Sequence, residues 1–459
     1  MREFDDRYEE EYVYLADLTD TAALISWGKF FFASTMELVP DKKIHLLDGQ
    51  HGRHTSIGAN CESYGPVDVE VRDESDAVVR TVRVVDDTFT WVTGLTPDTE
   101  YTYRVLADPD SARRVWADGH LCDYNPKIKE LVETARRYAC RFRTFPSLNA
   151  SAPVTFAVIG DTGTGSEDQR ALANALEVEI EKRDVRFVVM TGDTVYKSSG
   201  GTGNDDDEWL MTYFQPYRTL IDRIPFFPCV GNHDTGETLL EGGQGDTLTL
   251  YDNLLVSSRF GIARPGRDAS ITKGLFYRFR FGSDIELMCL DTSKDALLFG
   301  SRMFEKDPGK SWMRDALATP LGSPKWRIPF SHHPPYCAGP QHGDTNSMRE
   351  KIIPRCVENG VRVFISGHEH NFQCIDSEDA AKRVRCIVTG GAGQFRTGQP
   401  EKSTNGHVHS WGGNAGTHFL IVTINGSSMT IEPITAARQP LTLSDRLGGT
   451  ISGPIVVTL

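Results

Sequence analysis

Residues 154–193 read VTFAVIGDTGTGSEDQRALANALEVEIEKRDVRFVVMTGD, and this stretch decides the fold. It opens with the apolar run Val154–Ile159 and closes with the apolar run Val185–Met190, each short enough for a buried strand. Between them, Ser166 and Gln169 form a capping-box signature for the start of a helix. Apolar residues then recur every four positions and predict an amphipathic helix of about 16 residues; they are Leu172, Leu176 and Ile180. Strand, helix and strand in this order imply parallel pairing in a layered α/β domain.

The same alternation of short apolar runs with helices or long loops continues along the chain. Five further strands are expected at Phe226–Val230, Ile285–Leu290, Arg327–Phe330, Val361–Ile365 and Arg385–Val388. Near the end, two β-rich runs, 418–424 and 428–434, flank Asn425-Gly426, the strongest short hairpin signal. We therefore predict a layered β-sandwich flanked by helices over residues 150–440, followed by a C-terminal extension over 441–459.

The first 149 residues have a different, all-β pattern. Their β-rich runs are Thr21–Trp27, Val79–Val85, Thr88–Val92, Gly94–Val105 and Arg141–Phe145. Within the fourth run, Leu95-x-Pro97-x-Thr99-x-Tyr101 resembles the tyrosine-corner segment of fibronectin type III domains. The resemblance implies an immunoglobulin/fibronectin III-like β-sandwich over residues 1–149, in which the partly helix-like segment 108–137 is an insertion.

Length, charge and hydropathy exclude several classes of protein. A chain of 459 residues is expected to form two or three domains. Its net charge of −14 argues against a nucleic-acid partner. No apolar run approaches the ~20 residues needed to cross a bilayer, so no membrane partner is expected. The first residues lack the apolar stretch of a secretory signal, which favours a cytoplasmic protein unless a leader precedes this sequence.

Cysteine usage favours a reducing compartment. The chain has nine cysteines and no Cys-x-x-Cys pair. Cys229, Cys289 and Cys386 lie in apolar, strand-like runs, where a thiol behaves as a small buried hydrophobe. We therefore expect reduced structural cysteines, with one disulfide elsewhere as the alternative.

A residue of metal-ligating type follows five of the predicted strands within two or three positions. These residues are Asp161, Asp193, Asn232, His332 and His368. In an open α/β sheet, ligand sites lie beyond the carboxyl ends of the strands. The five side chains can therefore converge, although Asp161 and His368 are far apart in the sequence.

The local sequences around these residues form five motifs in order. They are Gly160-Asp161-Thr-Gly163, Gly192-Asp193-Thr-Val-Tyr196, Gly231-Asn232-His233-Asp234, His332-His333-Pro-Pro-Tyr336 and Gly367-His368-Glu-His370. In this order they resemble the calcineurin-like metallophosphoesterase superfamily, and most closely the purple acid phosphatases. The β-rich region in front agrees with the domain order of plant-type purple acid phosphatases. Gly163 stands where most of the superfamily has a histidine ligand, and Tyr196 takes a place typical of the purple acid subgroup.

The resemblance implies a binuclear metal centre. A phenolate ligand needs a strongly polarising ion, so Fe³⁺ is implied at one site; its ligands would be Asp161, Tyr196, His370 and the bridging Asp193. A divalent ion would occupy the second site; its ligands would be Asn232, His332, His368 and the same Asp193. These nitrogen and oxygen ligands suit Zn²⁺, Mn²⁺ or Fe²⁺, among which the sequence does not choose. The charge of the two ions exceeds that of their anionic ligands, so the site stays cationic and attracts a phosphate ester.

For activity, the resemblance implies hydrolysis of phosphomonoesters by metal-bound hydroxide, with in-line attack on phosphorus. His233 adjoins the ligand Asn232 and is our candidate general acid, with Asp234 orienting its ring. His342 lies where plant-type members carry a substrate-contacting histidine, and Gln341 replaces a second histidine there. A phosphodiesterase or nucleotidase on the same core is the alternative, because the motifs specify the metals and not the leaving group. A binding protein with a secondary metal core is a further alternative.

Simpler structural explanations exist for several of these residues. An aspartate after a strand is commonly a turn or cap residue, and the ordered set of motifs argues against this for Asp161. Tyr196 could be an ordinary half-buried tyrosine, and His333 could replace His332 as the ligand. Three other segments are interpreted as structural: the solvated turn Asp205–Glu208, the loop with His407 and His409, and the tight turn Gly390–Gly393.

Overall fold

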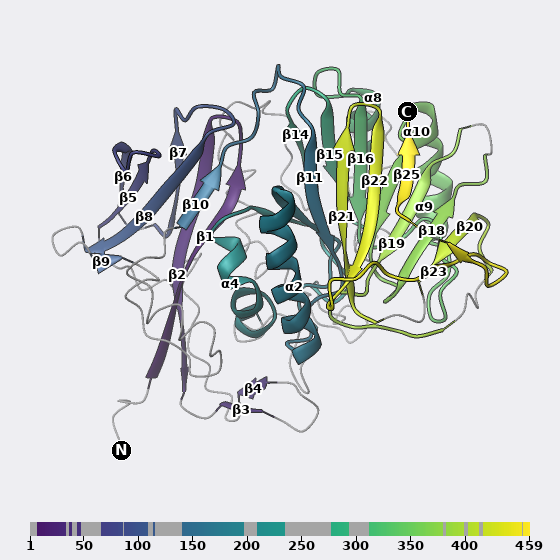
Figure 1. Cartoon of the computed structure of the whole chain (residues 1–459), viewed down its shortest axis with the longest axis horizontal. Coiled ribbons are helices and arrows are strands. Elements are labelled where there is room, and N and C mark those ends of the chain that lie inside the picture. Colours follow the sequence, from purple (N-terminus) through teal and green to yellow (C-terminus); the bar gives the residue numbers. More distant parts are fainter. Residues whose placement is uncertain are drawn as a thin grey trace.

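The computed structural model describes most of the two predicted regions. The described residues are 7–33, 36–38, 44–46, 66–85, 87–108, 113–114, 140–196, 209–234, 277–292, 312–379, 382–398, 403–412, 416–451 and 453–459. The predicted turn 205–208 and most of the predicted insertion 108–137 lie outside them. Figure 1 shows a β-sandwich at the N-terminal side, then helices, then two closely layered sheets.

The N-terminal region contains two antiparallel sheets, as its β-rich pattern predicts. The strands are β1 (Arg7–Leu18), β2 (Ala22–Ala33), β3 (Met36–Leu38), β4 (Ile44–Leu46), β5 (Val67–Arg72), β6 (Val78–Val84), β7 (Phe89–Thr93), β8 (Glu100–Asp108), β9 (Arg113–Arg114) and β10 (Cys140–Arg143). One sheet has the order β1-β2-β7 and the other the order β10-β8-β5-β6, with β9 against β8. Strands β3 and β4 form a separate pair.

Tyr101 makes the hydrogen bond that a tyrosine corner requires. Its hydroxyl accepts a bond of 3.0 Å from the backbone N–H of Thr96, five residues upstream. Its ring is buried with its centroid 5.7 Å from that of Phe142 on the neighbouring strand β10. The bond therefore ties the connection between β7 and β8 to the interior of the sandwich.

The second region is built on two sheets. The first has the order β13-β12-β11-β21-β22-β25 and the second the order β14-β15-β16-β17-β19-β18-β20-β23-β24. The bounds are β11 Val154–Ile159, β12 Val185–Met190, β13 Phe226–Pro228, β14 Tyr277–Phe281, β15 Ile285–Cys289, β16 Trp326–Ser331, β17 Val363–Ser366, β18 Phe372–Asp376, β19 Arg385–Thr389, β20 His407–Trp411, β21 His418–Asn425, β22 Ser428–Thr435, β23 Leu443–Ser444, β24 Thr450–Ile451 and β25 Ile455–Thr458. Strands β11 and β12 pair in parallel, as predicted from the strand–helix–strand pattern.

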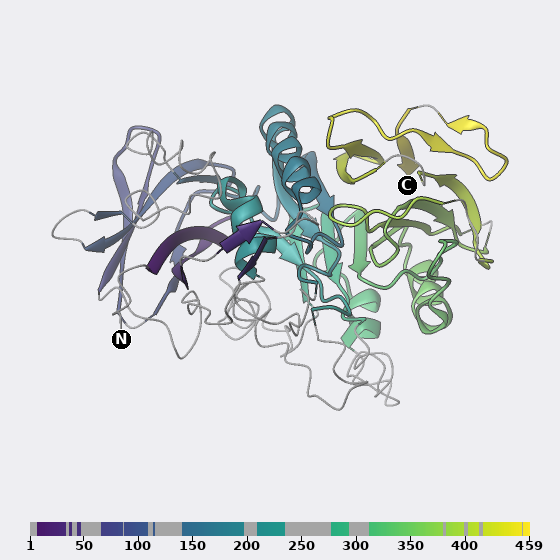
Figure 2. The same ribbon diagram turned by 90° about the horizontal axis from the view of Figure 1, so that it is seen from below.

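Helices cover the outer faces of both sheets, which gives four layers (Figures 1 and 2). Helix α2 (Glu167–Arg183), a π-helical turn (Leu210–Phe214) and α4 (Gln215–Ile221) pack on the first sheet and on β1. Helices α8 (Trp312–Ala318), α9 (Asn346–Lys351) and α10 (Ile353–Glu358) pack on the second sheet. Between the sheets lies an apolar layer that includes Phe156, Val189, Leu287 and Ile328.

Helix α2 begins at the predicted cap, although the capping box is shifted by one residue. Ser166 Oγ accepts a bond of 3.2 Å from the N–H of Gln169. The Gln169 side chain reaches back to the N–H of Gly165 at 2.8 Å, and not to that of Ser166. The buried face of the helix includes Leu172, Leu176 and Ile180, as the periodicity predicts.

Three details near the C-terminus differ from the simplest interpretation of the sequence. The hairpin turn consists of Gly426 and Ser427, because Asn425 pairs with Ser428 across the strands. Gly426 has a φ of 59°, so the glycine takes the first central position of the turn and not the second. His407 and His409 lie in strand β20 and not in a loop. The segment 441–459 adds β23 and β24 to one sheet and β25 to the other.

The two regions share apolar and charged contacts. The ring of Phe145, at the end of the N-terminal region, lies 5.0 Å from that of Phe281 and 5.9 Å from that of Phe187. Arg143 pairs with Asp184 at 3.3 Å, and the buried Arg186 donates to the carbonyl of residue 144 at 2.7 Å. The hydrophobic core therefore continues from the sandwich into the space between the two sheets.

The seven cysteines in the described part of the chain are free thiols, six of them buried. This agrees with the expected structural role, and Cys61 and Cys122 lie outside the described residues. Among the described helices, none has the length and apolar character needed to cross a membrane.

Candidate metal centre

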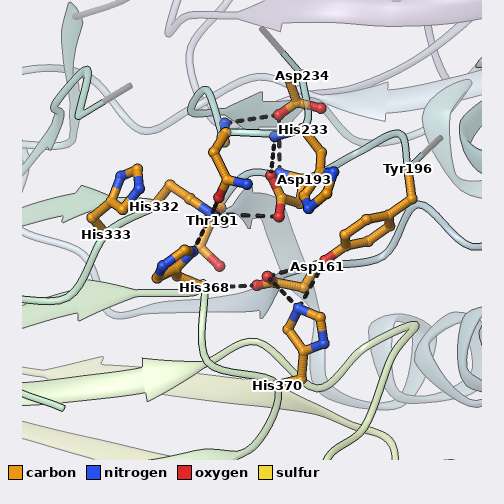
Figure 3. Close-up of polar contacts among 12 residues, drawn as sticks. Asp161, Thr191, Asp193, Tyr196, His233, Asp234, His332, His333, His368 and His370 are labelled. Carbon is orange, nitrogen blue, oxygen red and sulfur yellow. Dashed lines mark hydrogen bonds and ion pairs between the residues drawn. The ribbon is translucent and has the colours of Figure 1, made fainter. Parts of the chain in front are cut away.

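The structure brings the predicted site residues together at the carboxyl ends of strands from both sheets (Figure 3). The loop after β11 carries Asp161, and the loop after β12 carries Asp193 and Tyr196. The loops after β13, β16 and β17 supply the remaining residues, which are Asn232, His233, Asp234, His332, His368 and His370. Parallel strands whose ends meet at one edge explain why residues far apart in sequence converge.

Three of these residues have backbone conformations that L-amino acids rarely adopt. The φ angles of Asp161, Asp193 and His368 are 57°, 52° and 73°. Non-glycine residues in this left-handed region carry strain, and such residues are enriched at functional sites, although four others in this chain lie elsewhere. Glycines make room beside them: a Cβ on Gly231 would overlap the Asp193 carboxylate, and one on Gly367 would overlap that of Asp161.

One group of ligand atoms surrounds the Asp161 carboxylate. Oδ1 lies 3.2 Å from the Tyr196 hydroxyl and 3.3 Å from His370 Nε2, and these two atoms are 3.1 Å apart. Oδ2 accepts the backbone N–H of His368 at 3.0 Å. The tyrosine, histidine and aspartate therefore point at a common space, as predicted for the first metal site.

A second group of ligand atoms surrounds His332 Nε2. This nitrogen lies 2.9 Å from Asn232 Oδ1, 3.1 Å from His368 Nδ1 and 3.4 Å from Asp193 Oδ2. The other ring nitrogen, Nδ1, lies 2.8 Å from the carbonyl oxygen of Thr191. A carbonyl partner fixes Nδ1 as the protonated nitrogen and leaves the Nε2 lone pair for a ligand.

The electrostatics of the cluster fit bound cations. Burial raises the pKa values of Asp161 and Asp193 to about 7, since ionised carboxylates are costly away from water. Burial lowers the pKa of His332, lowers that of His370 to about 4 and lowers that of His368 well below its usual value. Neutral imidazoles beside carboxylates that need a positive partner form a donor set for metal ions, and Asp161, Asp193 and His332 have their ligand atoms within 4.8 Å of one another.

Tyr196 is buried, and its surroundings oppose ionisation. Burial first, and then the nearby carboxylates of Asp161 and Asp193, raise the pKa of its hydroxyl well above the usual value. A phenolate here therefore requires a strongly charged cation in the space between Asp161 and His370.

Asp234 has a structural role that the sequence did not predict. Its Oδ2 accepts the N–H groups of Gly231 and Asp193 at 2.8 and 2.9 Å, and its Oδ1 accepts those of Thr194 and Val195 at 2.8 and 3.2 Å. Four donors use the acceptor capacity of a carboxylate. Asp234 therefore holds two loops together, and its predicted action on the His233 ring stays a prediction.

The remaining predicted histidines lie around the ligand atoms. The His233 ring has its centroid 4.6 Å from that of Tyr196, and its backbone N–H donates to Asp193 Oδ1 at 3.0 Å. The His342 ring stacks on His368 at 4.0 Å with an interplanar angle of 31°. The His333 ring lies 4.5 Å from His368. Its Nδ1 lies 3.1 Å from Thr292 Oγ1, whereas His332 contacts the other ligand candidates directly.

Sequence reasoning missed three residues of this site. Thr191 contacts His332, and Thr292 contacts His333. Thr292 follows strand β15, so the expectation that ligand sites lie beyond the carboxyl ends of strands could have identified it. Glu369 lies between two ligand candidates in the fifth motif, and this position was the only feature of the sequence that pointed to a role in the site. The turn Gly390–Gly393 lies behind Asp161, whose carbonyl oxygen accepts the N–H of Gly393 at 3.1 Å.

The chain is similar in sequence and in fold to several known proteins. The family model for calcineurin-like phosphoesterases matches residues 154–372. Purple acid phosphatase 17 of Arabidopsis thaliana is 30% identical over 245 residues, which cover 52% of this chain and 68% of the relative. Tartrate-resistant acid phosphatase type 5 of Homo sapiens is 23% identical over 325 residues, covering 64% of this chain and 92% of the relative. A solved purple acid phosphatase from yellow lupin (Lupinus luteus) seeds shares the fold, with a TM-score of 0.64, 12% identity and coverage of 98% of this chain and 74% of that one.

Proposed function

Because this chain belongs to the purple acid phosphatase branch of the calcineurin-like phosphoesterases and is a phosphatase, we propose that it hydrolyses phosphomonoesters of small molecules at a binuclear metal centre. The observation that carries the proposal is the convergence of seven ligand-type residues in two groups, one around the Asp161 carboxylate and one around His332 Nε2, with ligand atoms of Asp161, Asp193 and His332 within 4.8 Å of one another. These residues are Asp161, Asp193, Tyr196, Asn232, His332, His368 and His370.

The residues divide into two ligand sets that share Asp193. Asp161, Tyr196 and His370 would hold a ferric ion, since only a highly charged cation offsets the raised pKa of the buried phenol. The second set contains two neutral imidazoles and an amide oxygen and would hold Zn²⁺, Mn²⁺ or Fe²⁺. When bound, the two ions would acidify a water molecule for attack on phosphorus and neutralise charge on the phosphoryl oxygens.

Two histidines of the chain would act on the substrate. His233 lies beside Tyr196 and Asp193 and would give a proton to the departing oxygen. His342 stacks over His368 at the edge of the ligand atoms and would bind the phosphate group. The buried Thr191 and Asp234 would maintain the geometry through backbone contacts.

We propose that the N-terminal region is a fibronectin type III-like scaffold. Support comes from its two antiparallel sheets and from the hydrogen bond of the Tyr101 hydroxyl. Its contacts with the second region, through Phe145 and Arg143, favour a structural role over an independent binding module.

The substitution Asp193→Asn tests the proposed centre. We expect the variant to lose both metals, or to lose activity by more than about 10²-fold, because removing a shared ligand should exceed the 10- to 100-fold cost of removing an outer-shell partner. Metal content by mass spectrometry and turnover of p-nitrophenyl phosphate, beside a panel of mono- and diesters, measure these effects.

Asp284→Asn serves as the control, since Asp284 precedes β15 at the opposite end of the strands and pairs with Lys325 at 2.8 Å. Two bound metals and near-normal turnover in Asp193→Asn would exclude a shared bridging carboxylate. Wild-type protein that binds no metal and turns over no ester would favour the binding-protein alternative.

A further inference from the structure

Glu369 is a buried carboxylate next to two metal-ligand candidates, but it contacts a different segment of the chain. It lies between His368 and His370, and its side chain is fully buried. Its Oε2 accepts the backbone N–H of His342 at 2.7 Å and that of Gln341 at 3.3 Å. The glutamate therefore links the loop after β17 to the loop that presents the His342 ring.

The loop around residues 339–342 fits closely against this side chain. A Cβ on Gly339 would overlap Cγ, Cδ and Oε2 of Glu369, so the backbone of Gly339 lies directly on the carboxylate. The ends of the loop have other anchors: Ala338 donates its N–H to Gln373 Oε1 at 2.9 Å, and Cys337 donates to Asp344 Oδ1 at 2.9 Å. Two side chains bond to the backbone of His342 itself: Glu369 accepts its N–H, and the Cys337 thiol donates to its carbonyl oxygen at 3.2 Å.

The charge of Glu369 is balanced by Arg396 on its other side. Glu369 Oε1 lies 3.6 Å from Arg396 Nη1, and neither atom has a hydrogen-bond partner among the described residues. The backbone N–H of Arg396 donates to the carbonyl oxygen of His370 at 2.7 Å. A buried carboxylate costs free energy unless it is paired. The two N–H donors and the arginine around Glu369 offset this cost, which indicates that the glutamate has a specific role at this position.

We propose that Glu369 is a positioning residue that holds the His342 imidazole over His368, where the phosphate group of the substrate binds. This inference rests on the proposed function, and it adds the residue that connects the substrate-binding loop to the metal-binding loop. Glu369 acts through the backbone of His342 and touches neither the metals nor the ester. Its loss should therefore raise KM and leave the metals in place.

A double-mutant cycle with Glu369→Ala and His342→Ala tests this role. We expect Glu369→Ala to lower kcat/KM by about 10- to 10²-fold, mainly through KM, because a displacement of about 1 Å can cost 10²-fold. In the His342→Ala background the same change should have almost no further effect, since the group it positions is gone. Glu369→Gln keeps an acceptor oxygen for the His342 N–H and should recover most of the loss.

Two further variants separate positioning from general stability. Glu286 in β15 is an equally buried carboxylate, paired with Arg327 at 2.8 Å. Glu286→Gln should lower Tm without changing KM. Gly339→Ala should raise KM as Glu369→Ala does, because its methyl group would push the loop off the glutamate. These variants keep the test decisive if Glu369→Ala does not fold.

The His342 ring also offers a readout that does not depend on activity. In ¹³C-histidine-labelled, metal-free protein, its stacking on His368 should shift its NMR resonances, and Glu369→Ala should abolish that shift. Any of three results would overturn the positioning role. The losses of kcat/KM could multiply in the double variant, the ring signal could stay unchanged in Glu369→Ala, or that variant could lose its metals. If the wild type is inactive on every ester but Glu369→Ala still changes the NMR signal of the His342 ring, the proposed function is refuted and the positioning role is not.

Discussion

At the residue scale, Tyr196 is the most unusual member of the site. Its hydroxyl is buried between Asp161 Oδ1 and His370 Nε2, at 3.2 and 3.1 Å. The surroundings raise its pKa, so it stays a phenol unless a strongly polarising ion binds. The ionisation state of Tyr196 would therefore report the charge of an ion bound in the proposed first site.

We expect the protein as isolated to absorb visible light through phenolate-to-iron charge transfer, and Tyr196→Phe to abolish this absorption. The fold should persist because only a hydroxyl is removed. Absorption spectra and iron analysis measure the effect, and Tyr217→Phe, which removes another buried hydroxyl, should keep the colour. A colourless, iron-free wild type that is fully active with two zinc or manganese ions would contradict the ferric assignment.

For His233 we expect the alanine variant to keep its metals and to lose turnover by about 10²–10⁴, the range for a general acid. The loss should be smaller for nitrophenyl than for alkyl phosphates, because a good leaving group needs little protonation. Steady-state kinetics on both substrate types check this, with His409→Ala in β20 as the control. Equal losses on both substrates would instead assign His233 to phosphate binding.

At the scale of elements, Asp234 explains how the loops after β12 and β13 keep a common geometry. Its carboxylate accepts four backbone N–H groups, two of them from Asp193 and Thr194, the others from Gly231 and Val195. The bond to Asp193 N–H lies beside a residue in the left-handed conformation, so it helps maintain that strained backbone.

Asp234→Asn should lower the free energy of unfolding by at least about 2 kcal/mol, because an amide leaves buried N–H donors without an acceptor. Metal affinity should fall as well, since the loop carrying Asp193 loosens. Denaturant unfolding of the metal-free protein measures the first effect and metal titration the second. Asp445 accepts the N–H groups of Leu447 and Gly449 in an exposed turn. Asp445→Asn should therefore have little effect on the free energy of unfolding or on metal affinity. Equal effects of the two substitutions would contradict the role assigned to Asp234.

At the scale of the whole molecule, buried carboxyls make metal binding and folding depend on pH. Burial raises the pKa values of Asp161, Asp193 and Asp234 to about 7, whereas these groups titrate near 4 in an unfolded chain. In the metal-free protein their contribution to stability is therefore greatest below pH about 4 and is lost as the pH rises to 7. The ligand candidates His332, His368 and His370 have lowered pKa values, that of His370 being about 4, because burial favours the neutral imidazole.

Metals must displace protons from Asp161 and Asp193, so we expect apparent metal affinity to fall between pH 7 and pH 5. Two pH units below a pKa of about 7, each competing carboxyl should weaken binding by roughly 10²-fold. The stabilisation that metal confers, measured as the increase in Tm, should shrink over the same range. Calorimetric titration at several pH values measures the affinity, and a constant affinity from pH 5 to 7 would show that these carboxyls are already ionised in the metal-free protein.

The sequence by itself predicted strands β11 and β12, helix α2 and the identity of the ligand candidates. Strands β11 and β12 have the bounds that their apolar runs predict, because burial on both faces leaves a continuous apolar signal. Ser166 and the four-residue apolar period located helix α2, since both patterns are local. The order of the five motifs was enough to predict that Asp161 and His368 lie at one site.

Tertiary structure decided the features that depend on contacts between distant segments. The hairpin register placed Gly426 and Ser427 in the turn, although Asn425-Gly426 had the stronger local signal. Asp234 bonds to backbone groups about 40 residues away, and Glu369 to a loop 27 residues away, so neither role has a sequence pattern. Backbone N–H groups are the same at every non-proline residue, and only the folded chain shows which of them a buried carboxylate must satisfy.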